Sequence, residues 1–224
     1  MSEPVRICGL GTRVPEETTL EALIALAECG EVFCALDNSD SFAWLKKHGL
    51  RLKKARKAAD VVAAAKEGGL VGVATWGHPQ FSSAFARETE AALSKAGLPY
   101  RIYGAISPVG SAFARSVSFL GGDYGYQGLQ SYDVETLLAD PAALTPRLPL
   151  VVYAESAAPL RWHALVALLR GAYPAGHEAR VYPVGADEER RTTVGKLTAK
   201  GLVGATILIP PSGGAPKRPH DIAG

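Results

Sequence analysis

Three turns in the first half of the chain, each rich in small residues, directly follow apolar segments. They lie at residues 9–11 (Gly-Leu-Gly), 77–79 (Gly-His-Pro) and 104–108 (Gly-Ala-Ile-Ser-Pro). Glycine lets a backbone approach a ligand closely, and open α/β sheets bind ligands at the carboxyl ends of their strands. Taken alone, each turn is explained as well or better by a tight strand–helix connection. Whether the turns bind a ligand must therefore be judged from the rest of the chain.

The turn at residues 9–11 resembles part of a dinucleotide-binding fingerprint. That fingerprint cradles a pyrophosphate with three glycines and binds a ribose through a later acidic residue. Here Val14 stands where the third glycine belongs, and two glutamates follow it closely. A nicotinamide oxidoreductase therefore remains an alternative that rests only on Gly9, Gly11 and Asp37.

Tyrosines gather in a segment that we expect to be a loop bridging two domains. Tyr124, Tyr126 and Tyr132 could exchange a proton with a bound substrate and are our candidate catalytic residues. Aromatic packing at the seam between the domains explains the same residues equally well.

A basic run occupies residues 46–57, with seven lysines and arginines and no acidic residue. It could meet an acidic substrate or partner, and Arg51 is a further candidate catalytic cation. A solvated helix face is the more common explanation. Nucleic-acid binding is not expected, because only Trp44 is near enough to offer a stacking surface.

Composition limits the classes of protein. The 224 residues (23.5 kDa) are 47% hydrophobic and 21% charged with a net charge of +2, which excludes a mainly disordered chain. We find no apolar run of about 18 residues and no signal peptide, so we expect a cytoplasmic protein without a membrane partner. Cys8, Cys29 and Cys34 are expected to be buried free thiols, and no metal site is expected.

The order of elements predicts two α/β domains. Strands expected at residues 5–10, 31–36, 70–75 and 100–103 alternate with helices, which indicates a mostly parallel sheet. Few helices separate the later strands, so we expect a mixed second sheet. The expected later strands are residues 148–153, 180–184, 192–197 and 205–209. We place an N-terminal domain at residues 1–112, a C-terminal domain at 113–211 and a flexible tail at 212–224.

The ordered set of motifs resembles the tetrapyrrole (corrin/porphyrin) methylase superfamily from about residue 4 to residue 211. The resemblance lies in the opening strand and helix at residues 5–22, the Gly-His-Pro turn at 77–79, the loop at 104–107, the segment 183–197 and the closing strand at 206–211.

This resemblance implies an S-adenosylmethionine-dependent methyltransferase, usually a homodimer, that binds its cofactor in a cleft between the two domains. It also implies that the first glycine loop lines the substrate side. The implied cofactor-binding positions are Thr75, Gly77, His78, Pro79, Phe81, Ser82, Ile106, Ser107, Ala112, Tyr153, Ala154, Pro183 and Val184.

Within the superfamily, residues 77–79, 128–133 and 209–211 look most like the borosin peptide backbone N-methyltransferases and their bacterial relatives. Those enzymes use Tyr and Arg residues on a helical segment after the second strand. The matching segment here, residues 46–66, holds Arg51 and Arg56 but no Tyr. The acceptor therefore stays open between a separate peptide and a tetrapyrrole or other small molecule, with Arg13 as a second candidate cation. A non-catalytic S-adenosylmethionine-binding or regulatory module is the alternative.

Overall fold

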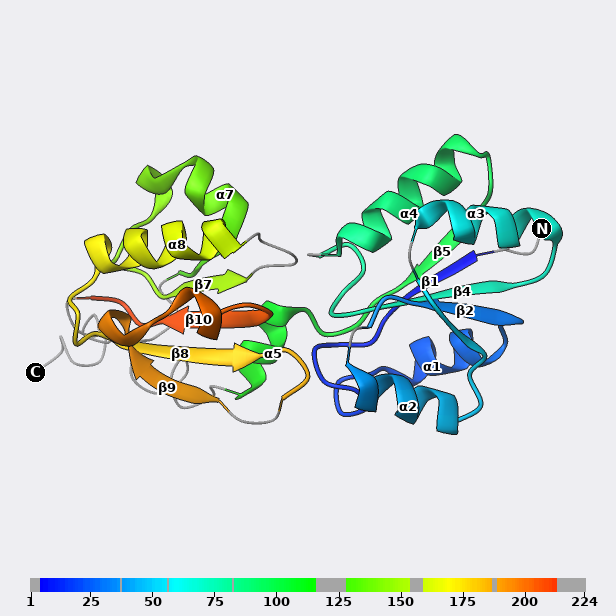
Figure 1. Ribbon diagram of the computed structural model, residues 1–224, viewed down its shortest axis with the longest axis horizontal. Coiled ribbons are helices and arrows are strands. Elements are labelled where there is room, and N and C mark those ends of the chain that lie inside the picture. The colour runs from blue at the N-terminus through cyan, green and yellow to red at the C-terminus, as the bar shows by residue number, and fades with distance from the viewer. Residues whose placement is uncertain are drawn as a thin grey trace, which may run out of the picture. The chain divides into compact units, whose positions relative to one another are not determined.

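The computed structural model describes residues 5–36, 38–55, 57–81, 83–115, 128–153, 159–186 and 189–212. The chain divides into two compact units, Met1–Ser111 (unit 1) and Ala112–Gly224 (unit 2), and each contains one sheet with its helices (Figure 1). Several residues singled out from the sequence lie outside the described residues. They are Asp37, Arg56, Ser82, Tyr124, Tyr126 and Ala154.

Unit 1 is built on a five-stranded sheet in the order β3-β2-β4-β1-β5. Every neighbouring pair is parallel, which confirms the parallel sheet expected from the alternating pattern. The strands are β1 (Val5–Gly9), β2 (Glu31–Cys34), β3 (Leu52–Lys54), β4 (Val71–Thr75) and β5 (Tyr100–Tyr103).

Helices cover both faces of this sheet (Figure 1). The helices α1 (Leu20–Ala27) and α2 (Ser39–Lys47) bury side chains in one core with Cys8, Cys34 and Ala74. The helices α3 (Ala58–Glu67) and α4 (Ala84–Lys95) bury theirs in a second core with strand residues of the opposite parity, such as Ile7 and Val73. Alternate strand residues point to opposite faces, so β1 and β4 contribute to both cores. Every residue of β4 is buried, and so is every residue of β1 except the half-buried Arg6.

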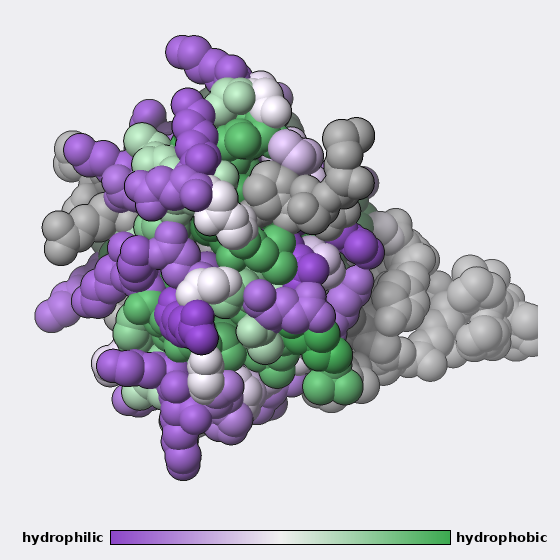
Figure 2. Space-filling model, turned by 90° about the vertical axis from the view of Figure 1, so that its right-hand side faces the viewer, coloured by the Kyte–Doolittle hydropathy of each residue, from purple (hydrophilic) through white to green (hydrophobic). Residues whose placement is uncertain are grey.

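The basic run does not form one helix face. Its first lysines end α2 at Lys47, its middle forms the edge strand β3, and its last lysine directly precedes α3. Lys53 and Lys54 are exposed on β3. Figure 2 shows the side of the molecule that lies at the right of Figure 1, where long hydrophilic side chains project between smaller hydrophobic areas.

Unit 2 contains a mixed five-stranded sheet in the order β6-β7-β10-β8-β9, as expected from the scarcity of helices in this half. Only β6 and β7 pair in parallel, and the other three neighbouring pairs are antiparallel. The strands are β6 (Gln130–Asp133), β7 (Leu150–Tyr153), β8 (Glu178–Pro183), β9 (Arg190–Thr193) and β10 (Ala205–Ile209).

One face of the second sheet is covered by α7 (Val134–Ala139) and α8 (Pro159–Ala172), and Trp162, Leu165 and Leu169 of α8 are buried in its core. The helix α5 (Pro108–Arg115) contains the boundary between the units. Among the described residues, the helices are too short or too polar to cross a bilayer.

Candidate functional site

Three loops of unit 1 follow strands that end at the same edge of its sheet. Gly9 of β1 pairs with Thr75 of β4, and Cys8 of β1 pairs with Tyr103 of β5. Because the strands are parallel, their carboxyl ends meet there. The three sequence turns, at residues 9–11, 77–79 and 104–108, therefore lie together.

The first two loops are in direct backbone contact. The Gly77 N–H donates to the Gly11 carbonyl at 2.8 Å. A β-carbon on Gly9 would lie 2.3 Å from the Gly77 oxygen and 2.7 Å from Cδ of Pro79. Gly77 has a φ of +61°, which favours glycine, and a β-carbon there would lie 3.1 Å from Cδ of Pro108. Glycine is therefore required by close packing among all three loops.

His78 connects the second loop to the third. Its Nδ1 accepts a hydrogen bond from the Gln80 N–H at 3.2 Å, so the neutral ring carries its proton on Nε2. A β-carbon on Gly104 would lie 2.9 Å from that Nε2. The Phe81 N–H donates to the His78 carbonyl at 2.9 Å, which closes the turn.

Thr75 contributes a buried polar group without a partner. The residue is only 1% exposed, and its Oγ1 makes no hydrogen bond. A buried hydroxyl left unpaired costs about 1–3 kcal/mol. It lies at the end of β4, two residues before the Gly-His-Pro turn.

The third loop leads directly into α5. The Ser107 hydroxyl accepts a hydrogen bond from the Gly110 N–H at 3.1 Å, and Pro108 occupies the first helical position. Ile106 is 38% exposed, so its side chain is available for an apolar contact.

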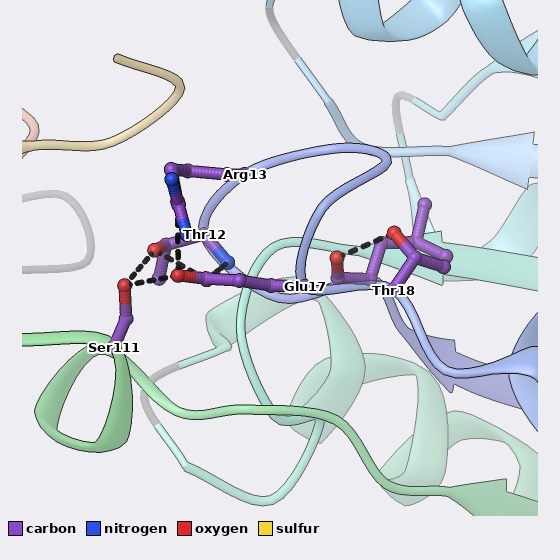
Figure 3. Close-up of polar contacts among 6 residues, drawn as sticks. Thr12, Arg13, Glu17, Thr18 and Ser111 are labelled. Carbon is purple, nitrogen blue, oxygen red and sulfur yellow. Dashed lines mark hydrogen bonds and ion pairs between the residues drawn. The ribbon is translucent and has the colours of Figure 1, made fainter. Parts of the chain in front are cut away.

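A buried carboxylate lies behind the first loop. Both oxygens of Glu17 accept hydrogen bonds: Oε2 from the N–H and hydroxyl of Thr12, each at 2.8 Å, and Oε1 from the Ser111 hydroxyl at 2.5 Å. Nε of Arg13 lies 3.1 Å from Oε1 and completes the cluster (Figure 3). Burial alone would raise the pKa of this carboxyl, but the hydrogen bonds outweigh burial and hold its pKa below the usual value.

This cluster was not predicted from the sequence, where Glu16 and Glu17 appeared only as an acidic pair unsuited to phosphate. The i,i+4 spacing of Arg13 and Glu17 is the local signal that could have indicated an ion pair. The third partner, Ser111, is 94 residues away from Glu17 in the sequence, which no local pattern reveals.

In unit 2, the strands β6, β7 and β8 run in the same direction, since β10 is antiparallel to both β7 and β8. Tyr153 ends β7 and Pro183 ends β8, so these two predicted cofactor contacts lie at one edge of the second sheet. Val184 follows and donates its N–H to the Gly204 carbonyl at 2.8 Å. Ala112 is fully buried in α5.

Two predicted catalytic residues are placed differently from what the sequence suggested. Tyr132 lies in β6 rather than in a loop, packs against the unit 2 core, and donates its hydroxyl to the Ala143 carbonyl at 3.3 Å. Arg51 precedes β3 and is exposed at the amino-terminal edge of the first sheet, opposite the three loops. Within unit 1, Arg51 is therefore not brought to the loop cluster.

The three cysteines are buried free thiols, as expected. Burial raises the pKa of Cys29 and of Cys34 to about 11, and raises that of Cys8 further. Such thiols are poor nucleophiles, so they are structural. The described residues hold no group of three or more metal-binding side chains.

Comparison with known proteins decides the family. The family model described as Tetrapyrrole (Corrin/Porphyrin) Methylases matches residues 5–199. The chain belongs to the tetrapyrrole methylase family. Members of this family are methyltransferases that use S-adenosylmethionine, and S-adenosylmethionine is accordingly the methyl donor of this enzyme.

Solved structures agree on the fold. Similar chains include a uroporphyrin-III-C-methyltransferase from Thermus thermophilus, with 22% identity, TM-score 0.68, and 92% of this chain and 94% of that chain covered. The methyltransferase CobJ has 18% identity, TM-score 0.69, and coverages of 94% and 95%. The cobalt precorrin-4 methyltransferase CbiF has 16% identity, TM-score 0.68, and coverages of 92% and 94%. No curated protein sequence matches this tetrapyrrole methylase.

Proposed function

We propose that the second and third loops of unit 1, at residues 77–79 and 104–108, hold S-adenosylmethionine and that the acceptor is a tetrapyrrole. The observation that carries the cofactor site is the buried, unpartnered hydroxyl of Thr75. It lies beside the turn at residues 77–79, which contains a single glycine, Gly77. When bound, S-adenosylmethionine supplies an electrophilic methyl group.

The residues around Thr75 suit this cofactor. The turn at residues 77–79 offers backbone hydrogen-bonding groups, and Ile106 offers an exposed apolar surface. Ser107 fixes the start of α5 through its cap. The contributions expected from Phe81, Ser82, Ala112, Tyr153, Ala154, Pro183 and Val184 remain part of the proposal.

The acceptor is inferred from what the loop cluster lacks among its described residues. An amide nitrogen is barely nucleophilic, so a peptide N-methyltransferase must deprotonate it or stabilise its carbonyl oxygen. Tyr132 already donates its hydroxyl to Ala143, and Arg51 lies at the opposite edge of the sheet. A tetrapyrrole carbon needs less assistance, which favours the substrate class named for the uroporphyrin-III and precorrin-4 enzymes over a borosin-like peptide.

Calorimetric titration with S-adenosylmethionine, and separately with S-adenosylhomocysteine, tests the cofactor site. We expect micromolar affinity for at least one, weakened by Thr75→Val. A folded protein that binds neither ligand contradicts the proposed site. We also propose that the protein is a homodimer, as the family resemblance implies. Light scattering tests this by measuring the molar mass in solution.

The acceptor is tested by incubation with labelled S-adenosylmethionine and reduced uroporphyrin III, followed by mass spectrometry. A mass gain of one or more methyl groups on the tetrapyrrole supports the proposal. Methylation of a peptide amide instead supports the borosin-like alternative. Cofactor binding without transfer to any acceptor of either class favours the non-catalytic module.

A further inference from the structure

Three consecutive side chains connect the loops of the candidate site. The Thr18 hydroxyl donates to the Leu10 carbonyl at 2.8 Å, and the Thr19 hydroxyl donates to the Gly104 carbonyl at 3.4 Å. Glu17 reaches both Thr12 and Ser111. We call residues 17–19 the brace, because each member bonds a loop that belongs to the site.

Glu17 is the charged member of the brace. Its side chain is 3% exposed and accepts hydrogen bonds from two hydroxyls, one backbone N–H and one guanidinium (Figure 3). Hydrogen bonds to an ionised carboxylate are about twice as strong as those between neutral groups. The carboxylate therefore holds Thr12 and Ser111 in a defined position relative to each other.

Two of the three residues bonded to Glu17, Thr12 and Ser111, are linked in turn to the loops of the proposed cofactor site. Thr12 follows Gly11, whose carbonyl accepts the Gly77 N–H at 2.8 Å. Ser111 donates its own N–H to the Ser107 carbonyl at 2.8 Å, one helical turn earlier. The loops at residues 77–79 and 104–107 are thus both linked to the same carboxylate, that of Glu17, each through a short series of hydrogen bonds.

We propose that Glu17 is a positioning residue of this enzyme, whose ionised carboxylate sets the spacing between the two loops that contact S-adenosylmethionine. This inference rests on the proposed cofactor site. Glu17 acts through Thr12 and Ser111 and makes no contact with the cofactor itself.

The two hydrophobic cores of unit 1 are packed without this carboxylate. Glu17 is not a member of either hydrophobic core of unit 1, and the helix that follows it is capped by the Thr19 hydroxyl, which accepts a hydrogen bond from the Ala22 N–H at 3.2 Å. Replacing the carboxylate with an amide of the same shape should therefore leave the strands and helices in place while loosening the loops.

The experiment compares S-adenosylhomocysteine affinity among folded variants by calorimetry at 10 °C. Glu17→Gln removes the charge and part of the acceptor capacity, and Glu16→Gln removes a neighbouring exposed charge as the matched control. Thr12→Val removes the hydroxyl and keeps the shape, whereas Thr12→Ser keeps the hydroxyl. Circular dichroism and the thermal midpoint are recorded for each variant.

We expect Glu17→Gln and Thr12→Val to weaken the affinity about tenfold, whereas Glu16→Gln and Thr12→Ser stay within about twofold of the wild type. Unchanged affinity in a folded Glu17→Gln variant, even with a lower thermal midpoint, would overturn the proposal and leave Glu17 as a stabilising residue only. Absence of binding in the wild type would instead refute the proposed cofactor site, so the two failures are distinguishable.

Discussion

The imidazole of His78 lies directly against the backbone of Gly104, so that a β-carbon on Gly104 would come within 2.9 Å of Nε2. The same ring accepts the Gln80 N–H through Nδ1. One side chain of the second loop therefore depends on the third loop having no side chain at this position.

Gly104→Ala should displace the His78 ring rather than unfold unit 1. The clashing atom is the end of a side chain that can rotate, so we expect a loss of about 1 kcal/mol, comparable to the hydrogen bond to Gln80. Urea unfolding measures the loss, and the double variant His78→Ala/Gly104→Ala should show less than the sum of the two single effects. Strict additivity would contradict the contact.

Gly9→Ala should be much more damaging. Here the β-carbon would meet the Gly77 backbone oxygen at 2.3 Å, and this backbone, which is bonded to the first loop through the Gly77 N–H and the Gly11 carbonyl, cannot rotate away as a side chain can. We expect a loss of about 3 kcal/mol or more in the free energy of unfolding. Gly30→Ala is the matched control, because the nearest atom to its β-carbon would be 3.8 Å away. Similar losses in both variants would refute the close approach of the loops.

Thr75→Val should separate stability from binding. The valine removes a buried hydroxyl that has no partner, so the free protein should keep or gain about 1 kcal/mol of stability. Affinity for S-adenosylmethionine should fall about tenfold if that hydroxyl bonds the cofactor.

Thr89→Val is the control for Thr75. Thr89 is equally buried, but its hydroxyl already donates to the Phe85 carbonyl at 2.7 Å. This variant should lose stability and keep its cofactor affinity. If Thr75→Val binds S-adenosylmethionine as tightly as the wild type, the Thr75 hydroxyl does not bond the cofactor.

The contribution of Glu17 to stability should depend on pH. Its pKa is depressed in the folded protein, so the stabilisation is fully present above the unfolded pKa of about 4.3 and is lost as pH falls through the lower folded value. The free energies of unfolding of wild type and Glu17→Gln, measured in urea, should therefore differ by about 1–3 kcal/mol at pH 7, and this difference should shrink as the pH falls below the unfolded value. A difference that stays constant with pH would mean that the charge is not involved.

The cysteines should react slowly with thiol reagents in the native protein. Cys8, Cys29 and Cys34 are at most 6% exposed, and burial raises the pKa of each thiol. We expect all three to react at least about a hundredfold faster in denaturant, because the reactive thiolate is then accessible. A fast-reacting thiol in the native state would contradict their burial.

Much of the fold could be predicted because its signals are local. The strand at residues 100–103 and the one at 205–209 have the predicted bounds, since each is a short apolar or aromatic run between turn residues. The parallel and mixed character of the two sheets followed from how often helices interrupt the strands. The free cysteines followed from their odd number and apolar surroundings.

Other elements have local sequence patterns that favour a different structure from the one observed. The edge strand Leu52–Lys54 is short and rich in lysine, so the sequence shows a basic run there and not a strand pattern. The strand β6 begins and ends with the polar residues Gln130 and Asp133, which favour a loop in a sequence-based prediction. The contact between Glu17 and Ser111 joins residues that are 94 positions apart in the sequence. Such contacts arise from packing and leave no trace in local spacing.

The edge strand β3 also affects whether two copies of this protein can join their sheets and aggregate at high concentration. An outermost strand offers unpaired backbone groups to any other extended chain, and sheets grow into aggregates by that route. Here the strand is three residues long and projects exposed Lys53 and Lys54. Lys53 forms an ion pair with Glu31 of β2, so Lys54 is the lysine whose charge opposes a second copy that pairs along this strand. The short length of β3 and the charge of Lys54 therefore both disfavour extension of the sheet at this edge.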